Sequence, residues 1–159
     1  MSSNSYHFED HWHVPFPIED VWDVLSKPTK FPHWWRGVYL QARTLESNDE
    51  PHVGQRIAVL TKGWLPYKLR WTIETTRLER PRLIEFKASG DFSTDGSRWI
   101  LRPENGGTDV MLDWNPIVEK PVVKFLSPVL KPVFEWNHHW AMRLGERQIA
   151  GYMLTSRSK

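Results

Sequence analysis

Six consecutive segments in the middle of the chain alternate apolar and polar residues, and no helical pattern interrupts the series. The predicted strands cover residues 38–46, 54–62, 66–79, 82–90, 97–103 and 108–118. Turn-like sequence separates them, at residues 48–51, 62–66, 80–81, 95–96 and 105–107. Connections this short join antiparallel neighbours, whereas parallel strands need a crossover of about a dozen residues or more. The pattern therefore predicts an antiparallel meander and argues against a doubly wound α/β fold.

One strand and two short helices are predicted before the meander. Residues 6–14 alternate, with Phe8 and Trp12 on one face, which predicts a half-buried strand. Residues 18–25 follow, with acids in the first turn and apolar side chains at helical spacing. A second short helix or turn is predicted at 29–35. The chain thus enters the meander through a strand and two helical pieces.

The pattern changes again after the last predicted strand. Residues 120–131 are mostly apolar and include Pro121 and Pro128, which predicts a broken helical segment. A continuous helix is predicted from Pro132, a favourable residue for a first helical turn, to about Leu154. The chain therefore ends in the longest helix of the domain.

The face that this last helix turns toward the sheet is predicted to be partly polar. At about 100° per residue, one broad face carries Val133, Trp136, Asn137, Trp140, Leu144, Arg147, Gln148 and Gly151. The opposite face, expected to meet water, carries Glu135, His139, Glu146 and Met153. Buried amide and guanidinium groups need partners, at about 1–3 kcal/mol for each unmet group. Either the sheet supplies them, for example Asp113 or Glu74 for Arg147, or a ligand and trapped water do.

Ten tryptophans in 159 residues are an unusual content for one small domain. Each indole can bury about 150–250 Å² and carries an N–H group that needs a hydrogen-bond acceptor. This content predicts a wide interior, an aromatic cavity wall or an exposed interaction surface.

Composition narrows the remaining function classes. The 21 basic and 19 acidic residues are interleaved and give a net charge of +2, so no nucleic-acid patch is expected. The absence of cysteine excludes disulfides and thiolate sites. No signal peptide or integral membrane segment is recognisable, which favours a cytoplasmic protein.

No metal or cofactor site is predicted. The imidazoles of His11 and His13 share one face of the first strand, but that face should be the outer one and a third ligand is not apparent. His138 and His139 point in different directions on a helix, with His138 at the flank of the sheet. Neither a Gly-rich phosphate loop nor a recognisable nucleophile motif occurs.

Residues 12–38 read WHVPFPIEDVWDVLSKPTKFPHWWRGV, and residues 136–143 read WNHHWAMR. Together with the order of the predicted elements, these stretches resemble the START-like (SRPBCC) superfamily, most closely its polyketide cyclase/dehydrase-type branch. The resemblance implies one α+β domain over residues 1–159 with the helix-grip fold. In that fold, a curved antiparallel sheet of about seven strands surrounds a long C-terminal helix, and two short helices follow strand one.

The resemblance also implies a deep cavity between the sheet and the last helix. Its mouth is expected near Trp34 and Trp35, the loop at 63–64 and the apolar segment 122–130, which would serve as a lid. The residues expected to bind a ligand there are Trp136, Asn137, Trp140, Leu144, Arg147, Gln148, Trp71, Trp114 and Trp35.

Three functions remain open. The first is a binding or carrier protein for a small hydrophobic or amphipathic ligand of lipid, polyketide or isoprenoid type, present as a monomer or weak dimer. The second is a polyketide cyclase or dehydratase, with acid–base and donor candidates Asp113, Glu74, Arg147, Asn137 and Tyr67. Strand parity turns Glu74 and Asp113 outward, so no catalytic residue is assigned. The third is a protein-interaction module that uses exposed tryptophans.

Overall fold

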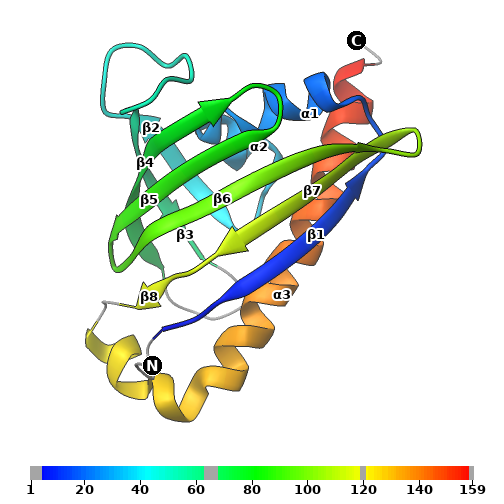
Figure 1. Ribbon diagram of the computed structural model, residues 1–159. Helices are drawn as coiled ribbons and strands as arrows, with labels where there is room; N and C mark the ends of the chain where they lie inside the picture. The colour runs from blue at the N-terminus through cyan, green and yellow to red at the C-terminus, as the bar shows by residue number, and fades with distance from the viewer. Residues whose placement is uncertain (1–4, 63–67, 119–120, 158–159) are drawn as a thin grey trace.

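The computed structural model describes residues 5–62, 68–118 and 121–157. Its strands are β1 (Phe8–Val14), β2 (Tyr39–Thr44), β3 (Arg56–Thr61), β4 (Leu69–Glu79), β5 (Leu83–Gly90), β6 (Phe92–Glu104), β7 (Gly107–Trp114) and β8 (Ile117–Val118). Its helices are α1 (Ile18–Leu25), the 3-10 turn η1 (Pro28–Lys30), α2 (Phe31–Trp34) and α3 (Pro121–Arg157). Figure 1 shows the sheet curling around α3, so the helix-grip architecture is confirmed.

The sheet is antiparallel at every described pairing, in the order β1-β7-β6-β5-β4-β3-β2, with β8 paired to β6. The two strands that flank the short helices in sequence, β1 and β2, therefore form its opposite edges. Helices α1 and α2 connect these edges and cover one end of the curved sheet (Figure 1). The buried face of α1 carries Val21, Trp22 and Leu25, at the spacing expected of an amphipathic helix.

One predicted turn is wrong. Residues 95–96 lie inside β6, and the chain reverses instead near Gly90, whose φ of 130° few other residues adopt. Opposite them, the pairing steps from Phe86↔Ser97 to Ala88↔Thr94, which leaves one extra residue on β6. The Asp-Gly pair thus marks a β-bulge, which bends a strand without ending it.

The predicted turn at 105–107 is confirmed, with positive φ at Asn105 and Gly106. The predicted turn at 62–66 lies largely outside the described residues.

The last helix begins earlier than predicted. Its backbone is helical from Pro121, and its first turns, drawn in yellow, run at an angle to the longer part (Figure 1). Proline removes a backbone donor and crowds the preceding turn, yet α3 continues through Pro128 and Pro132. The side chains of residues 122–128, on which the proposed lid depends, lie outside the described ones. Within the described ranges, no helix is long and apolar enough to cross a membrane.

The face of α3 that is buried differs from the predicted inner face: the helix is rotated by part of a turn about its axis. Among the residues of α3 whose burial the structure describes, Met142, Gly145, Ile149 and Met153 are buried, whereas Val133, Trp136, Arg147 and Gly151 are exposed. The sequence projection placed the tryptophans inward and Met153 outward. A residue without a side chain determines the actual orientation, because Gly145 lets the helix backbone approach the indoles of Trp12 and Trp35.

Candidate ligand-binding cavity

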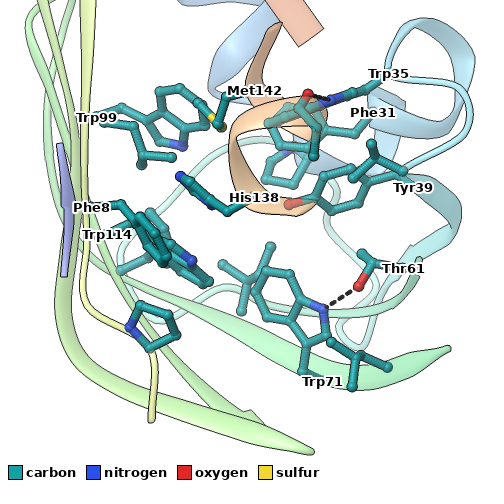
Figure 2. Close-up of a pocket in the computed structure, with 18 of the residues that line it drawn as sticks. Phe8, Phe31, Trp35, Tyr39, Thr61, Trp71, Trp99, Trp114, His138 and Met142 are labelled. Carbon is teal, nitrogen blue, oxygen red and sulfur yellow. Dashed lines mark hydrogen bonds between the residues drawn. The ribbon is translucent and has the colours of Figure 1, made fainter. Parts of the chain in front are cut away.

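A cavity of about 210 Å³ lies between the concave face of the sheet and α3 (Figure 2). Aromatic side chains form a large part of its wall. The rings that line it belong to Tyr6, Phe8, Phe31, Trp35, Tyr39, Trp71, Phe86, Phe92, Trp99, Trp114 and Phe134. Such a wall favours flat apolar molecules, because ring faces offer a large contact area at a small cost in side-chain entropy.

Trp71 of β4 forms one part of this wall. Its indole Nε1 donates a hydrogen bond of 3.0 Å to Thr61 Oγ1 on β3, and its ring centroid lies 4.6 Å from that of Phe92 and 5.8 Å from that of Trp114. Because alternate residues of a strand share one face, Trp71 and Ile73 both face the cavity, as predicted. The satisfied N–H lets a polar ring edge lie in an apolar site.

Trp35, at the end of α2, forms the opposite part of the wall and is 4% exposed. Its Nε1 donates a hydrogen bond of 3.0 Å to the carbonyl oxygen of Ala141 on α3. Its ring stacks on Trp34 at 5.3 Å and meets Trp12 edge-on at 5.3 Å. Trp34 and Trp35 are therefore buried core residues, and of the two Trp35 lines the cavity.

A few polar groups interrupt the aromatic wall. They include the hydroxyls of Tyr39, Thr61 and Thr75, the amide of Asn137 and the imidazole of His138. Burial raises the pKa of the Tyr39 hydroxyl well above its ordinary value of 10.0, so this group stays a neutral O–H at physiological pH. The cavity therefore offers a small number of hydrogen-bonding points within a mainly apolar site.

His138 is held against β1 by two contacts. Its Nε2 lies 2.6 Å from Asp10 Oδ2, and its ring is nearly parallel to that of Phe8, with centroids 3.8 Å apart. The side chains of His138 and Asp10 are only 13% and 11% exposed. Sequence reasoning missed this pair, although strand parity places Asp10 on the same face of β1 as Phe8 and Trp12.

The other histidines of this region lie outside the cavity. His7, His11 and His13 sit on the outer face of β1, as predicted, beside the carboxylates of Asp113, Asp109 and Glu104. Burial opposes protonation of His11, but hydrogen bonds to Asp109 and Glu9 raise its pKa overall above 6.5. Asp113 pairs with His7 and Arg98, and Glu74 pairs with Lys87, so neither is the partner of Arg147. Among the described residues, no group of three or more potential ligands could hold a metal ion.

The nine residues expected to bind ligand divide into three groups. Trp35, Trp71, Trp114 and Asn137 line the cavity. Trp140 and Leu144 are half-buried and pack against the core without lining it, and Gln148 is also half-buried. Trp136, which is 44% exposed, and Arg147 face away from the interior. The rotated helix explains these differences, and it also explains why His138 and Met142 were missed as lining residues.

Comparison with known proteins gives a consistent family assignment. The family described as polyketide cyclase / dehydrase and lipid transport matches residues 14–142. None of the curated proteins compared matches the sequence. Similarity to solved structures extends over nearly the whole chain, at identities that establish the fold alone.

The Zhui aromatase/cyclase from Streptomyces sp. R1128 superposes with a TM-score of 0.73 at 14% identity, covering 94% of this chain and 93% of that one. TTHA0849 from Thermus thermophilus gives a TM-score of 0.71 at 17% identity, covering 92% and 99%. The di-domain ARO/CYC BexL from the BE-7585A biosynthetic pathway gives 0.58 at 12% identity, covering 92% of this chain and 50% of that one. Since the family match spans most of the 159 residues, from the end of β1 into α3, the chain belongs to the polyketide cyclase/dehydrase and lipid transport family.

Proposed function

We propose that this protein binds a compact, mainly apolar ring compound in the cavity beneath α3. The observation that carries the proposal is the aromatic wall, which is built from the sheet, from α2 and from α3. The volume of about 210 Å³ lies below the roughly 300–1,000 Å³ of common ligand sites. A small ring system or a short chain therefore suits the cavity better than a lipid with two long acyl chains.

The distribution of tryptophans favours this proposal over a protein-interaction module. Among the tryptophans whose side chains are described, Trp136 is the one with a largely exposed ring. An interaction surface made of indoles would instead expose several of them together. Here most of the indole area lies in the core or along the cavity.

Titration of the purified protein with naphthalene-type compounds tests the proposal. Trp35, Trp71, Trp99 and Trp114 line the cavity, so a bound ring should change the tryptophan fluorescence in a saturable way. The variant Ala141→Phe should weaken binding, because Ala141 also lines the cavity and a benzyl group there would fill part of it. The matched control is Leu154→Phe, at an exposed position of the same helix, which should bind like the wild type. Failure of ring compounds and fatty acids alike to bind saturably would overturn the proposal.

A cyclase or dehydratase is the second candidate, and the His138–Asp10 pair is the observation that favours it. An imidazole oriented by a carboxylate can accept and return a proton, as a cyclisation with loss of water requires. Incubation with a linear poly-β-ketone, followed by mass spectrometry, would detect a product that has lost water. Turnover that is equal in the wild type and in His138→Phe would contradict a catalytic role for this pair.

A further inference from the structure

The residues before β1 close one end of the cavity. The β1–β7 pairing begins at Phe8, and residues 5–7, called here the N-terminal strap, precede it. The strap lies beside β8 and the N-terminal part of α3 (Figure 1). Tyr6 is 8% exposed and lines the cavity, and its ring centroid lies 5.9 Å from that of Phe8 and 6.4 Å from that of Phe134. The next side chain, His7, is 63% exposed, so the strap has the cavity on one side and solvent on the other.

The backbone of the strap is held by isolated contacts and not by a continuous ladder. Ser5 forms a single β-bridge with Ile117. The N–H of Tyr6 donates a hydrogen bond of 3.0 Å to the carbonyl oxygen of Pro116. A chain end held in this way can detach at a lower cost in free energy than a strand inside a sheet, because fewer hydrogen bonds must break. Detachment of the strap can therefore occur while β1 stays paired with β7.

Lys131 of α3 fastens the strap at two points. Its Nζ donates a hydrogen bond of 3.0 Å to the carbonyl oxygen of Ser5, and the same ammonium group lies 4.8 Å from the centroid of the Tyr6 ring. A cation over an aromatic face is attracted by the negative charge density of that face, and more strongly where both are partly removed from water. Both contacts break when the strap moves away from α3. Lys131 is therefore placed to act as a latch.

We propose that the N-terminal strap is a gate of the cavity, and that ligand enters and leaves when Lys131 releases Ser5 and Tyr6. This inference rests on the proposed function, because it concerns access to the same cavity. The latch closes the free and the occupied cavity alike. Its loss should therefore change the rates of binding and release by the same factor and leave the affinity unchanged, whereas loss of a wall contact mainly speeds release.

A cross-link of the strap tests the gate directly. Because the hydrogen bond from Tyr6 runs to Pro116, the facing residues Ser5 and Ile117 share no hydrogen bond with each other. The Cα atoms of such a pair lie about 4.5 Å apart, which suits a disulfide, and the chain has no cysteine of its own. Stopped-flow fluorescence then gives the rates for a naphthalene-type probe. In oxidised Ser5→Cys/Ile117→Cys, association and dissociation should each slow by about tenfold or more, and a thiol reductant should restore both rates.

The control cross-link is His13→Cys/Asp109→Cys, which joins β1 to β7 within the regular ladder. This facing pair also shares no hydrogen bond, because the N–H of His13 donates to Glu146. Its oxidation should leave both rates within about twofold of the wild type. Equal rates for the oxidised and reduced strap variant would overturn the inference, as would the same slowing in the control.

Lys131→Met tests the latch, because methionine keeps an apolar side chain but lacks the ammonium group. Association and dissociation should each become roughly tenfold faster, with a Kd within about twofold of the wild type. Lys87→Met makes the same change on the outer face of β5, where Lys87 pairs with Glu74, and should leave both rates unchanged. Faster dissociation alone would mean that Lys131 supports the wall, and would overturn its role as a latch.

Hydrogen exchange tests the strap without any ligand. The Tyr6 amide is protected only while the strap is closed, whereas the Trp12 amide lies within the β1–β7 ladder. Lys131→Met should speed exchange of the Tyr6 amide by roughly tenfold and leave that of Trp12 unchanged. Failure of ring compounds and fatty acids to bind would overturn the proposed function. In that case a faster Tyr6 exchange still supports opening of the strap, and an unchanged one overturns it.

Discussion

The indole of Trp35 lies directly against the backbone of Gly145. A Cβ atom at Gly145 would come within 2.7 Å of Trp35 Cε2 and 2.8 Å of Trp12 Cζ2, closer than carbon atoms can approach without displacement. One turn earlier on α3, the carbonyl oxygen of Ala141 accepts the indole hydrogen of Trp35. A single side chain thus fixes both the distance and the register between α2 and α3.

Gly145→Ala should destabilise the protein by about 1–3 kcal/mol, because both indoles would have to move in a closely packed core. Helix propensity alone would predict the opposite effect, a gain in stability, because alanine is a better helix former than glycine. Gly151→Ala is the control on the same helix, where nothing lies within 4 Å of the added Cβ. It should stabilise by about 0.5–1 kcal/mol. Urea unfolding measures both, and a stabilising Gly145→Ala would contradict the close approach.

Trp114→Leu should weaken binding of a naphthalene-type probe by roughly tenfold, because the ring lines the cavity and packs on Trp71 and Phe92. Trp136→Leu makes the same chemical change at an exposed ring and should leave affinity within about twofold of the wild type. Fluorescence titration of the two variants compares the sites directly. A larger loss in Trp136→Leu would mean that ligand binds on the outer face of α3.

Gln148→Leu should stabilise the protein by about 1 kcal/mol. The side-chain oxygen Oε1 of Gln148 is buried without a hydrogen-bond partner among the described residues, so leucine removes an unmet polar group. Gln55→Leu is the opposite case, since its Nε2 donates to the carbonyl oxygen of Asp49 and the residue is 2% exposed. That variant should lose about 1–3 kcal/mol. Thermal unfolding would refute this account if both variants moved the melting temperature in the same direction.

Glu46→Gln should change how stability depends on pH. The backbone N–H and then the guanidinium of Arg56 donate to this carboxylate and hold the pKa of Glu46 below 4.5. A depressed folded-state pKa contributes stability above the unfolded value and loses it as pH falls through the folded value. The variant should therefore be less stable than the wild type at neutral pH, with a difference that shrinks below pH 4.5.

Glu50→Gln is the control for this measurement, because Glu50 is exposed and its carboxylate makes no ion pair among the described residues. Urea unfolding of the two variants across the acidic range gives the comparison. A difference for Glu46→Gln that stays constant with pH would show that the Arg56 contact does not stabilise the folded state.

The strands could be predicted because each has one buried face, so the period-two pattern is present in the sequence itself. Trp71 and Ile73 faced inward as parity required, and α1 covers the predicted residues 18–25. The bulge in β6 resembled a turn, because Asp-Gly favours both. These features depend on local chemistry, which a single sequence records.

The face of α3 could not be predicted in the same way. Hydrophobic periodicity favours large apolar residues such as Trp136 on the inside, whereas the closest packing occurs at Gly145, a residue with no side chain to count. The His138–Asp10 pair joins residues 128 positions apart in sequence, and it depends on the rotation of that helix. The lining residues His138 and Met142 could therefore not be predicted, because the rotation of α3 depends on tertiary packing.

The strand order also constrains when the protein can fold. The first strand, β1, pairs with β7, so His7 meets Asp113 across 106 residues of chain. At the usual rate of about 5–20 residues per second, β1 waits roughly 5–20 s on the ribosome before its partner has been synthesised. During that interval Phe8 and Trp12 lack the residues of β7 with which they pair, Trp114 and Val110. Completion of the domain thus depends on the synthesis of β7 and α3.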